Sequence, residues 1–239
     1  ILDGTAWTTA VPTVPTPEAD YGYEFEKWTP VFPESVTGSV TYVASFVKDA
    51  SKWHTVTFEA GANGSLTGTT SYSDILDGTA WTTAVPTVPT PEADYGYEFE
   101  KWTPVFPESV TGSVTYVASF VKDASKWHTV TFEAGANGSL TGTTSYSNIL
   151  DGTAWTTAVP TVPTPEADYG YKFDKWTPVF PESVTGSVTY VASFVKDASK
   201  WHTVTFEAGA NGSLTGTTSY SDILDGTAWT TAVPTVPTP

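Results

Sequence analysis

The sequence predicts an α+β protein made of small tandem units, each with strand order ββαββ, a mostly antiparallel sheet and one short helix. Two observations carry this prediction. Residues 75–81 recur at 1–7, 149–155 and 223–229, so the chain repeats itself every 74 residues. Within one repeat, four stretches show the alternation or run of apolar residues that is typical of strands, and a single stretch suits a helix.

The first two strands are predicted to form a hairpin. Residues 55–59 alternate between polar and apolar, with Val56 and Phe58 on one face. Asn63 and Gly64 then supply the positive φ angles that tight hairpin turns need. Residues 65–72 are therefore expected to return antiparallel to the first strand.

The helix is predicted within residues 77–84, where Asp77 or Thr79 can cap the first turn. Pro86 ends it, which leaves room for one or two turns. Trp81 is the one large apolar residue of this stretch and is expected to insert into the sheet. The three prolines of residues 85–91 then predict an extended, polyproline-like connector.

The last two strands follow the connector. Residues 95–102 alternate, with Tyr97 and Phe99 on one face. Residues 113–120 alternate more clearly, and their apolar face holds Val114, Tyr116, Ala118 and Phe120.

Composition limits the classes of partner and chemistry. The chain has 26 acidic residues against 10 lysines and a net charge of −16, which argues against nucleic acid or an anionic membrane surface as partner. It has no Cys, which excludes disulfides and thiolate zinc sites. No stretch of 18 apolar residues indicates direct membrane insertion. No nucleophile with a base and an orienting acid is identifiable, so we expect no enzyme, cofactor or catalytic residue.

The polar residues 122–126 predict the boundary between units. With this boundary, residues 54–127 and 128–201 are complete repeats. Residues 1–53 lack the first hairpin, and residues 202–239 lack the last two strands. We expect adjacent repeats to be partners, with the terminal half-repeats completed end to end by a neighbouring chain or by continuation of the array.

The joint between repeats is predicted to be stiff. About five polar residues separate Phe120 from Trp127, whereas a flexible tether would be longer and richer in Gly and Ser. The alternative is that each joint tryptophan only caps its own core. The predicted joint residues are Trp53, His54, Trp127, His128, Trp201 and His202.

Other residues allow further interpretations. Asn63, Asn137 and Asn211 match the N-glycosylation sequon, although the turn alone explains an Asn-Gly pair. Asp74 and Asp77 faintly suggest calcium but lack the spaced carboxylates of a loop site, so capping and turn formation explain them better.

A family resemblance rests on the order and spacing of several motifs rather than on any one. The motifs are Thr55-Val-Thr-Phe58, Asn63-Gly64, Gly78-Thr-x-Trp81, Val88-Pro-Thr-Pro91, Gly96-Tyr-x-Phe-x-x-Trp102 and Thr115-Tyr-Val-Ala-Ser-Phe120. Together they resemble the Listeria-Bacteroides, or internalin B-type, repeats, which are β-grasp-like modules of cell-surface proteins. The resemblance implies tandem β-grasp-like units in a rod, an extracellular or cell-wall location, and a stalk or adhesive function without catalytic residues.

Two functions are therefore expected from different classes. The first is a non-enzymatic stalk or fibre region, adhesin-like, that acts as a stiff spacer or filament. The second is a module that binds glycans or host proteins through exposed aromatic residues. For the second, Trp28, Trp102 and Trp176 would form an exposed platform.

Overall fold

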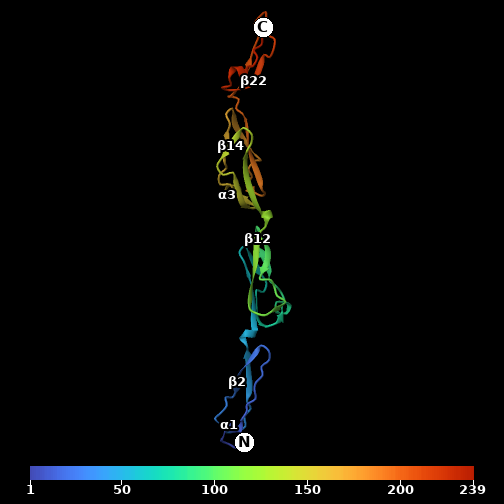
Figure 1. Ribbon diagram of the computed structural model, residues 1–239, viewed down its shortest axis with the longest axis vertical. Helices are drawn as coiled ribbons and strands as arrows, with labels where there is room; N and C mark the ends of the chain where they lie inside the picture. Colours follow the sequence, from blue (N-terminus) through green and yellow to red (C-terminus); the bar gives the residue numbers. More distant parts are fainter. The chain divides into compact units, whose positions relative to one another are not determined.

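The computed structural model describes residues 1–239 and is mostly β, with short helices. The chain divides into two compact units, residues 1–121 and 122–239, which are described separately. Each unit contains one four-stranded sheet and one part that has only two-stranded sheets. Figure 1 labels β2 and β12 in the first unit and α3 and β14 in the second.

The first unit contains the second half of one repeat followed by a complete repeat. They are β1 (Thr5–Ala6), α1 (Trp7–Ala10), β2 (Tyr23–Thr29), β3 (Ser35–Val36), β4 (Val43–Lys48), the 3₁₀ helix η1 (Ala50–Lys52), β5 (Trp53–Ala60), β6 (Gly64–Thr67), β7 (Ser71–Leu76), β8 (Thr79–Ala80), α2 (Trp81–Ala84), β9 (Thr90–Ala93), β10 (Tyr97–Thr103), β11 (Ser109–Val110) and β12 (Val114–Lys122), which ends at the unit boundary.

The second unit contains a complete repeat followed by the first half of the next. Its elements are η2 (Ala124–Lys126), β13 (Trp127–Ala134), β14 (Gly138–Thr141), β15 (Ser145–Leu150), β16 (Thr153–Ala154), α3 (Trp155–Ala158), β17 (Thr164–Ala167), β18 (Tyr171–Thr177), β19 (Ser183–Val184), β20 (Val188–Lys196), β21 (Trp201–Thr205), β22 (Ser219–Leu224) and α4 (Trp229–Ala232).

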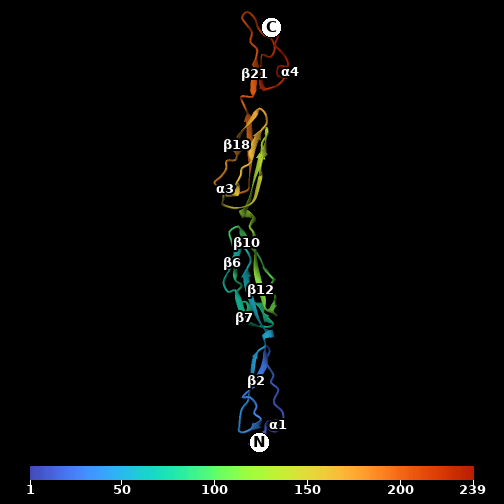
Figure 2. The ribbon, with the colours of Figure 1, turned by 90° about the vertical axis from the view of Figure 1, so that its left-hand side faces the viewer.

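The four-stranded sheet of the first unit has the spatial order β10-β12-β5-β7, and the second unit repeats it as β18-β20-β13-β15. The first and last strands of the repeat therefore lie side by side at the centre. They run parallel, with Val56 opposite Val114 and Phe58 opposite Tyr116. The outer pair β5–β7 is antiparallel. In Figure 2 the labels β6, β7, β10 and β12 lie together in the first unit.

The apolar faces predicted for the strands pack into an aromatic core. Val56, Phe58 and Tyr116 are buried on one side of the sheet, as their alternation predicts. The Phe58 ring lies 5.6 Å from that of Tyr116 and 5.2 Å from that of Trp102. A register shift in the equivalent strand β18 turns the tryptophan to the same side as the preceding phenylalanine, which simple alternation does not predict.

The prediction that residues 65–72 pair with the first strand is wrong in part. Strand β6 pairs instead with β9 of the proline-rich connector, and only β7 returns along β5. Asn63 has the predicted positive φ of 70°, whereas Gly64 is not in the positive-φ region. The connector is thus partly a strand, because the backbone groups of Thr90 and its neighbours find partners in β6.

The helix has one turn, within the one or two turns predicted, but it is not capped by a side chain. Helix α2 has four residues, and Ala80 at its N-cap position makes no side-chain hydrogen bond. Thr79 donates instead to the Leu76 carbonyl at 2.5 Å. The predicted insertion of Trp81 is confirmed, since its ring stacks on Phe106 at 4.6 Å beside the buried core. None of the helices has the length and hydropathy of a membrane-spanning segment.

Candidate functional site: an inter-repeat joint

A short 3₁₀ turn joins two repeats within the first unit. It consists of η1, and Asp49 precedes it as N-cap. The Asp49 carboxylate accepts hydrogen bonds from the Ser51 amide at 2.9 Å and the Ser51 hydroxyl at 2.7 Å. These bonds lower the pKa of Asp49 because they stabilise its charged form. The linker is therefore a hydrogen-bonded turn with one defined conformation.

Gly22 connects the earlier repeat to this linker. Its carbonyl accepts hydrogen bonds from the Trp53 indole at 2.7 Å and from the Asp49 amide at 2.9 Å. Its φ is +89°, and a Cβ placed there would lie 2.4 Å from Leu76 Cδ1. Gly22 thus allows the close contact between the turn that starts β2 and the next repeat.

Asp77 accepts hydrogen bonds from both repeats. The Tyr21 hydroxyl donates to its Oδ2 at 2.8 Å, and its Oδ1 lies 3.0 Å from His54 Nε2. The hydrogen bonds from His54 and Tyr21 lower the pKa of Asp77, and the bond to Asp77 raises the pKa of Tyr21. The Asp77 amide also donates to the Lys52 carbonyl at 2.8 Å. Asp77 therefore links the linker, its own repeat and the preceding one.

A cation–π contact lies on the same joint. Lys48 Nζ is 4.2 Å from the Trp53 ring centroid and 2.5 Å from Asp74 Oδ1. Asp74 has a positive φ of 57° within β7, at the place where the register between β5 and β7 shifts. Both charged side chains are exposed, so the ion pair itself contributes little to stability. Its main effect is to hold the lysine over the indole ring.

The second unit builds the same joint from residues 148 positions further along. The Trp201 indole donates to the Gly170 carbonyl at 2.6 Å, and the Tyr169 hydroxyl donates to Asp225 at 3.0 Å. Lys196 Nζ lies 4.3 Å from the Trp201 ring centroid. The joint is therefore found once within each unit, with the same kinds of partner.

One contact of the second joint is looser than its counterpart. His202 Nε2 lies 3.6 Å from Asp225 Oδ1, compared with 3.0 Å between His54 and Asp77. The His202 side chain is 52% exposed, whereas that of His54 is 11% exposed. His54 belongs to a strand with neighbours on both sides, and His202 belongs to a two-stranded sheet.

Trp127 and His128 start the complete repeat of the second unit. Trp127 pairs with Leu150 in the sheet, and Lys122 Nζ lies 4.1 Å from its ring centroid. His128 Nε2 lies 3.0 Å from Asp151 Oδ1. A joint role for these two residues stays a prediction.

The three tryptophans of the predicted aromatic platform lie next to other aromatic rings. The Trp102 ring packs against Phe58 and lies 6.1 Å from Phe106, and it is only partly exposed. Trp176 takes the same place beside Phe132 and Phe180. Trp28 lies 6.1 Å from Phe32. All three tryptophans are half-buried, and their role as an exposed platform stays a prediction.

The remaining candidate residues lie at the surface. Asn63, Asn137 and Asn211 are exposed, and each has a positive φ in its turn. Their glycosylation stays untested. Asp74 and Asp77 are engaged by Lys48 and His54, and no group of three or more His, Asp or Glu side chains could hold a metal ion.

Several joint residues were missed by sequence reasoning. Asp77 was expected to cap the helix, whereas its carboxylate binds Tyr21 and His54. Tyr21 lies 56 residues before Asp77, and Gly22 lies 31 residues before Trp53, so no local pattern connects them. The available signal was the polar run 49–52, whose turn brings the flanking residues together.

Comparisons of the chain with protein-family models, with curated proteins and with solved structures found no match.

Proposed function

We propose that this chain is a non-enzymatic structural repeat region of a cell-surface or extracellular stalk or fibre, in which folded repeats act as stiff spacers. The observation that carries the proposal is the joint. Within each unit, a tryptophan indole, a tyrosine hydroxyl and a lysine connect one repeat to the next through the same contacts. A three-residue linker turn with such contacts restricts bending.

The order of the strands supports the finer assignment of the repeat. In the four-stranded sheet, the first and last strands of the repeat, β5 and β12, run parallel at the centre, and β7 and β10 lie at the edges. This is the arrangement expected of a β-grasp-like unit. The resemblance of the sequence to surface-protein repeats points the same way. The extracellular location of the chain and its adhesin-like role are part of this proposal, and both rest on that resemblance.

The acidic composition suits a spacer that must remain extended. With 26 acidic residues and 10 lysines, like charges are distributed over every repeat. Their repulsion opposes association of one repeat with the faces of others at low salt. A spacer of this kind needs no ligand site and no metal.

Small-angle X-ray scattering on chains of two, three and four repeats tests the spacer function. We expect the maximum dimension to grow by a constant step of at least about 30 Å per added repeat, the size of a compact unit of this length. Growth with the square root of repeat number would contradict stiffness.

A matched pair of variants assigns the stiffness to the joint. Replacing Trp53, Trp127 and Trp201 together by Ser should shorten the maximum dimension while leaving the circular dichroism of the sheets unchanged. Replacing the exposed Lys27, Lys101 and Lys175 by Ala is the control and should change neither. Equal scattering curves for both triple variants would show that the tryptophans do not stiffen the chain.

A further inference from the structure

The chain enters and leaves a complete repeat through two strands that lie side by side. Strand β5 begins at Trp53, directly after η1, and strand β12 ends at Lys122, shortly before η2. Because these strands run parallel, the two points lie at opposite ends of the strand pair. Tension along the chain therefore pulls β5 and β12 past each other along their own axes. In an antiparallel pair both points would lie at one end, and tension would open the pair one residue at a time.

Backbone pairing continues along the whole contact between these strands. Residues 56–60 lie opposite residues 114–118 without a register shift. Just beyond the last pair, the Gly61 amide donates to the Ala118 carbonyl at 2.8 Å. We call residues 56–60 and 114–118 the strand clamp. Sliding of one strand along the other strains all of its hydrogen bonds together, so they have to break in a single step.

Two hydroxyl contacts add to the strand clamp. The hydroxyl oxygens of Thr57 and Thr115 lie 2.6 Å apart across the two strands. Just before the first backbone pair, the Thr55 amide donates to the Ser113 hydroxyl at 3.0 Å. Both contacts cross from one strand to the other or to its flank, and sliding has to break them as well.

Buried side chains cover one face of the strand clamp. Val56, Phe58, Tyr116 and Ala118 are all buried, and they come from both strands. The Phe58 ring stacks on the Tyr116 ring, with the centroids 5.6 Å apart. These side chains keep water from the backbone on this face, so a strained hydrogen bond finds no water to replace its partner.

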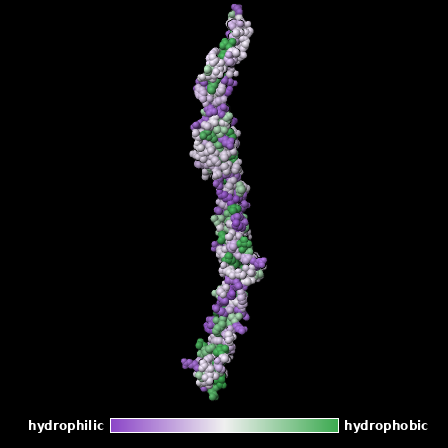
Figure 3. Space-filling model, viewed as in Figure 1, coloured by the Kyte–Doolittle hydropathy of each residue, from purple (hydrophilic) through white to green (hydrophobic).

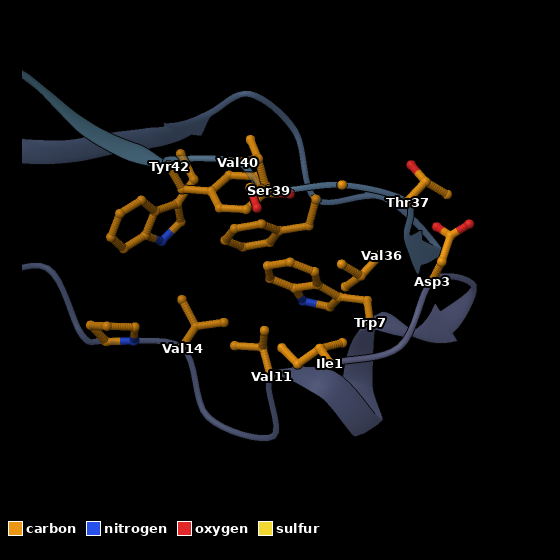
Figure 4. Close-up of a pocket in the computed structure, with 14 residues that line it drawn as sticks. Ile1, Asp3, Trp7, Val11, Val14, Val36, Thr37, Ser39, Val40 and Tyr42 are labelled. Atoms are coloured by element: carbon orange, nitrogen blue, oxygen red, sulfur yellow. The ribbon is translucent and has the colours of Figure 1, made fainter.

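Residues 1–53 give an internal comparison for the place of Phe58, because β4, the counterpart of β12, pairs there only with β2. Figure 4 shows Trp7 and Tyr42 facing an open groove of about 780 Å³, and Figure 3 shows hydrophobic surface gathered at this end of the first unit. Their counterparts in the complete repeat, Trp81 and Tyr116, both lie against the Phe58 ring. Phe58 therefore ties β5 to the last strand and to the helix.

The complete repeat of the second unit contains the same arrangement. Residues 130–134 of β13 run parallel to residues 188–192 of β20. The hydroxyl oxygens of Thr131 and Thr189 again lie 2.6 Å apart. The strand clamp is therefore a property of the complete repeat and is present in each unit.

We propose that the strand clamp makes each complete repeat a load-bearing element that stays folded when the chain is pulled along its length. Shear has to break the backbone pairs, the hydroxyl contacts and the ring packing together. The rate of forced unfolding is therefore set by this one contact. The inference deepens the proposed spacer function and rests on it, because a spacer that remains extended under tension has to remain folded.

Single-molecule force spectroscopy on the 239-residue chain tests the strand clamp with introduced cysteines, since the chain has none of its own. Thr55→Cys with Val121→Cys places the two handles at opposite ends of the strand pair and loads it in shear. Glu59→Cys with Val117→Cys places them on residues that lie opposite each other and opens the pair sideways. None of these four positions is buried. Each protein is reduced before the handles are coupled.

Both geometries should release a similar length of chain on unfolding, about 200 Å. At one pulling speed, we expect shear to need at least about twice the force of sideways opening, because five residue pairs share the load instead of one. Forces are compared between variants that have the same thermal midpoint by circular dichroism. The equivalent handle positions of the second unit, 129 with 195 and 133 with 191, provide a second matched set.

Equal forces in the two geometries, or a higher force for sideways opening, would overturn the strand clamp. That result would leave the spacer function standing, because scattering measures stiffness without load. Unequal forces together with square-root growth in scattering would instead overturn the spacer function and leave the strand clamp as a property of the fold.

Discussion

At the residue scale, Gly22 is a position where the joint of the first unit leaves no space for a side chain. Its φ is +89°, and an added Cβ would lie 2.4 Å from Leu76 Cδ1 and 3.3 Å from Trp53 Nε1. Replacement by Ala therefore strains the backbone and separates the indole from the Gly22 carbonyl. The joint depends on the absence of a methyl group at this site.

Gly22→Ala should lower the stability of the joint by at least about 1–2 kcal/mol, the cost of a left-handed conformation in an L-residue. Tryptophan fluorescence during thermal unfolding measures it, because Trp53 lies at the contact. Gly38→Ala is the control, since nothing lies within 4 Å of a Cβ there. Equal midpoints for both variants would contradict a close contact at Gly22.

The Tyr21 hydroxyl is a second residue whose effect can be isolated. It donates to Asp77 and, after the bond from His54, is a cause of the lowered pKa of that carboxyl. Tyr21→Phe should therefore raise the pKa of Asp77 toward its ordinary value, and NMR titration of the side-chain carboxyl measures this. Tyr23→Phe, in the same joint, should leave it unchanged. A Tyr21→Phe variant with unaltered titration would contradict the hydrogen bond.

The same carboxyl determines how the joint responds to acid. Because the folded-state pKa of Asp77 is lowered, its contribution is fully present above the ordinary carboxyl pKa of about 4 and is lost as pH falls through the folded pKa. Tyr21 has a raised pKa, so its contribution is lost only as pH rises above about 10. Asp77 and Tyr21 should accordingly both keep their contributions to the joint between these two limits.

At the scale of elements, the linker turn depends on its cap. Asp49→Ala removes the carboxylate that accepts the two hydrogen bonds from Ser51. The loss of such a cap typically costs about 1 kcal/mol of stability. Asp49→Asn keeps an acceptor and should recover most of the stability in thermal unfolding. If Ala and Asn have the same effect, the hydrogen bonds to Ser51 do not stabilise the turn.

The alternation of apolar and polar residues identified the main strands of the repeat but not the strands with which they pair. Residues such as Val56 and Tyr116 alternate with polar ones, so their burial follows from local sequence. The pairing of β6 with the proline-rich β9 has no such signal, because it depends on where the rest of the repeat places both segments. The parallel central pair likewise joins strands more than 50 residues apart.

The joint shows the same limit. The polar run and the tryptophan at its end were visible in the sequence, and they predicted where repeats meet. The partners of Trp53 were not visible, because Gly22 and Lys48 have no pattern that distinguishes them from other turn and surface residues. Asp77 was assigned to the helix because Asp commonly caps helices, yet long-range partners bind its carboxylate.

At the scale of the whole molecule, the repeats place one sequence in different surroundings. Residues 55–59, 129–133 and 203–207 are identical. The first two copies lie in the interior of four-stranded sheets, and the third lies in a two-stranded one. The Thr55 amide donates to the Ser113 hydroxyl and the Thr129 amide to the Ser187 hydroxyl, and each serine immediately precedes the neighbouring strand. Any difference between the copies therefore arises from tertiary structure alone.

Hydrogen exchange should reveal this difference within a single peptide mass. Peptic peptides from the three copies are indistinguishable, so slow exchange in two copies and fast exchange in the third should give two isotope populations in a ratio of about two to one. Residues 40–46, 114–120 and 188–194 are also identical and should give the same ratio, with residues 40–46 of the two-stranded sheet exchanging fast. The loop 104–108 and its two copies should exchange as one fast population. At the lowest workable concentration, a single slow population for residues 55–59 and their copies would contradict the two kinds of sheet.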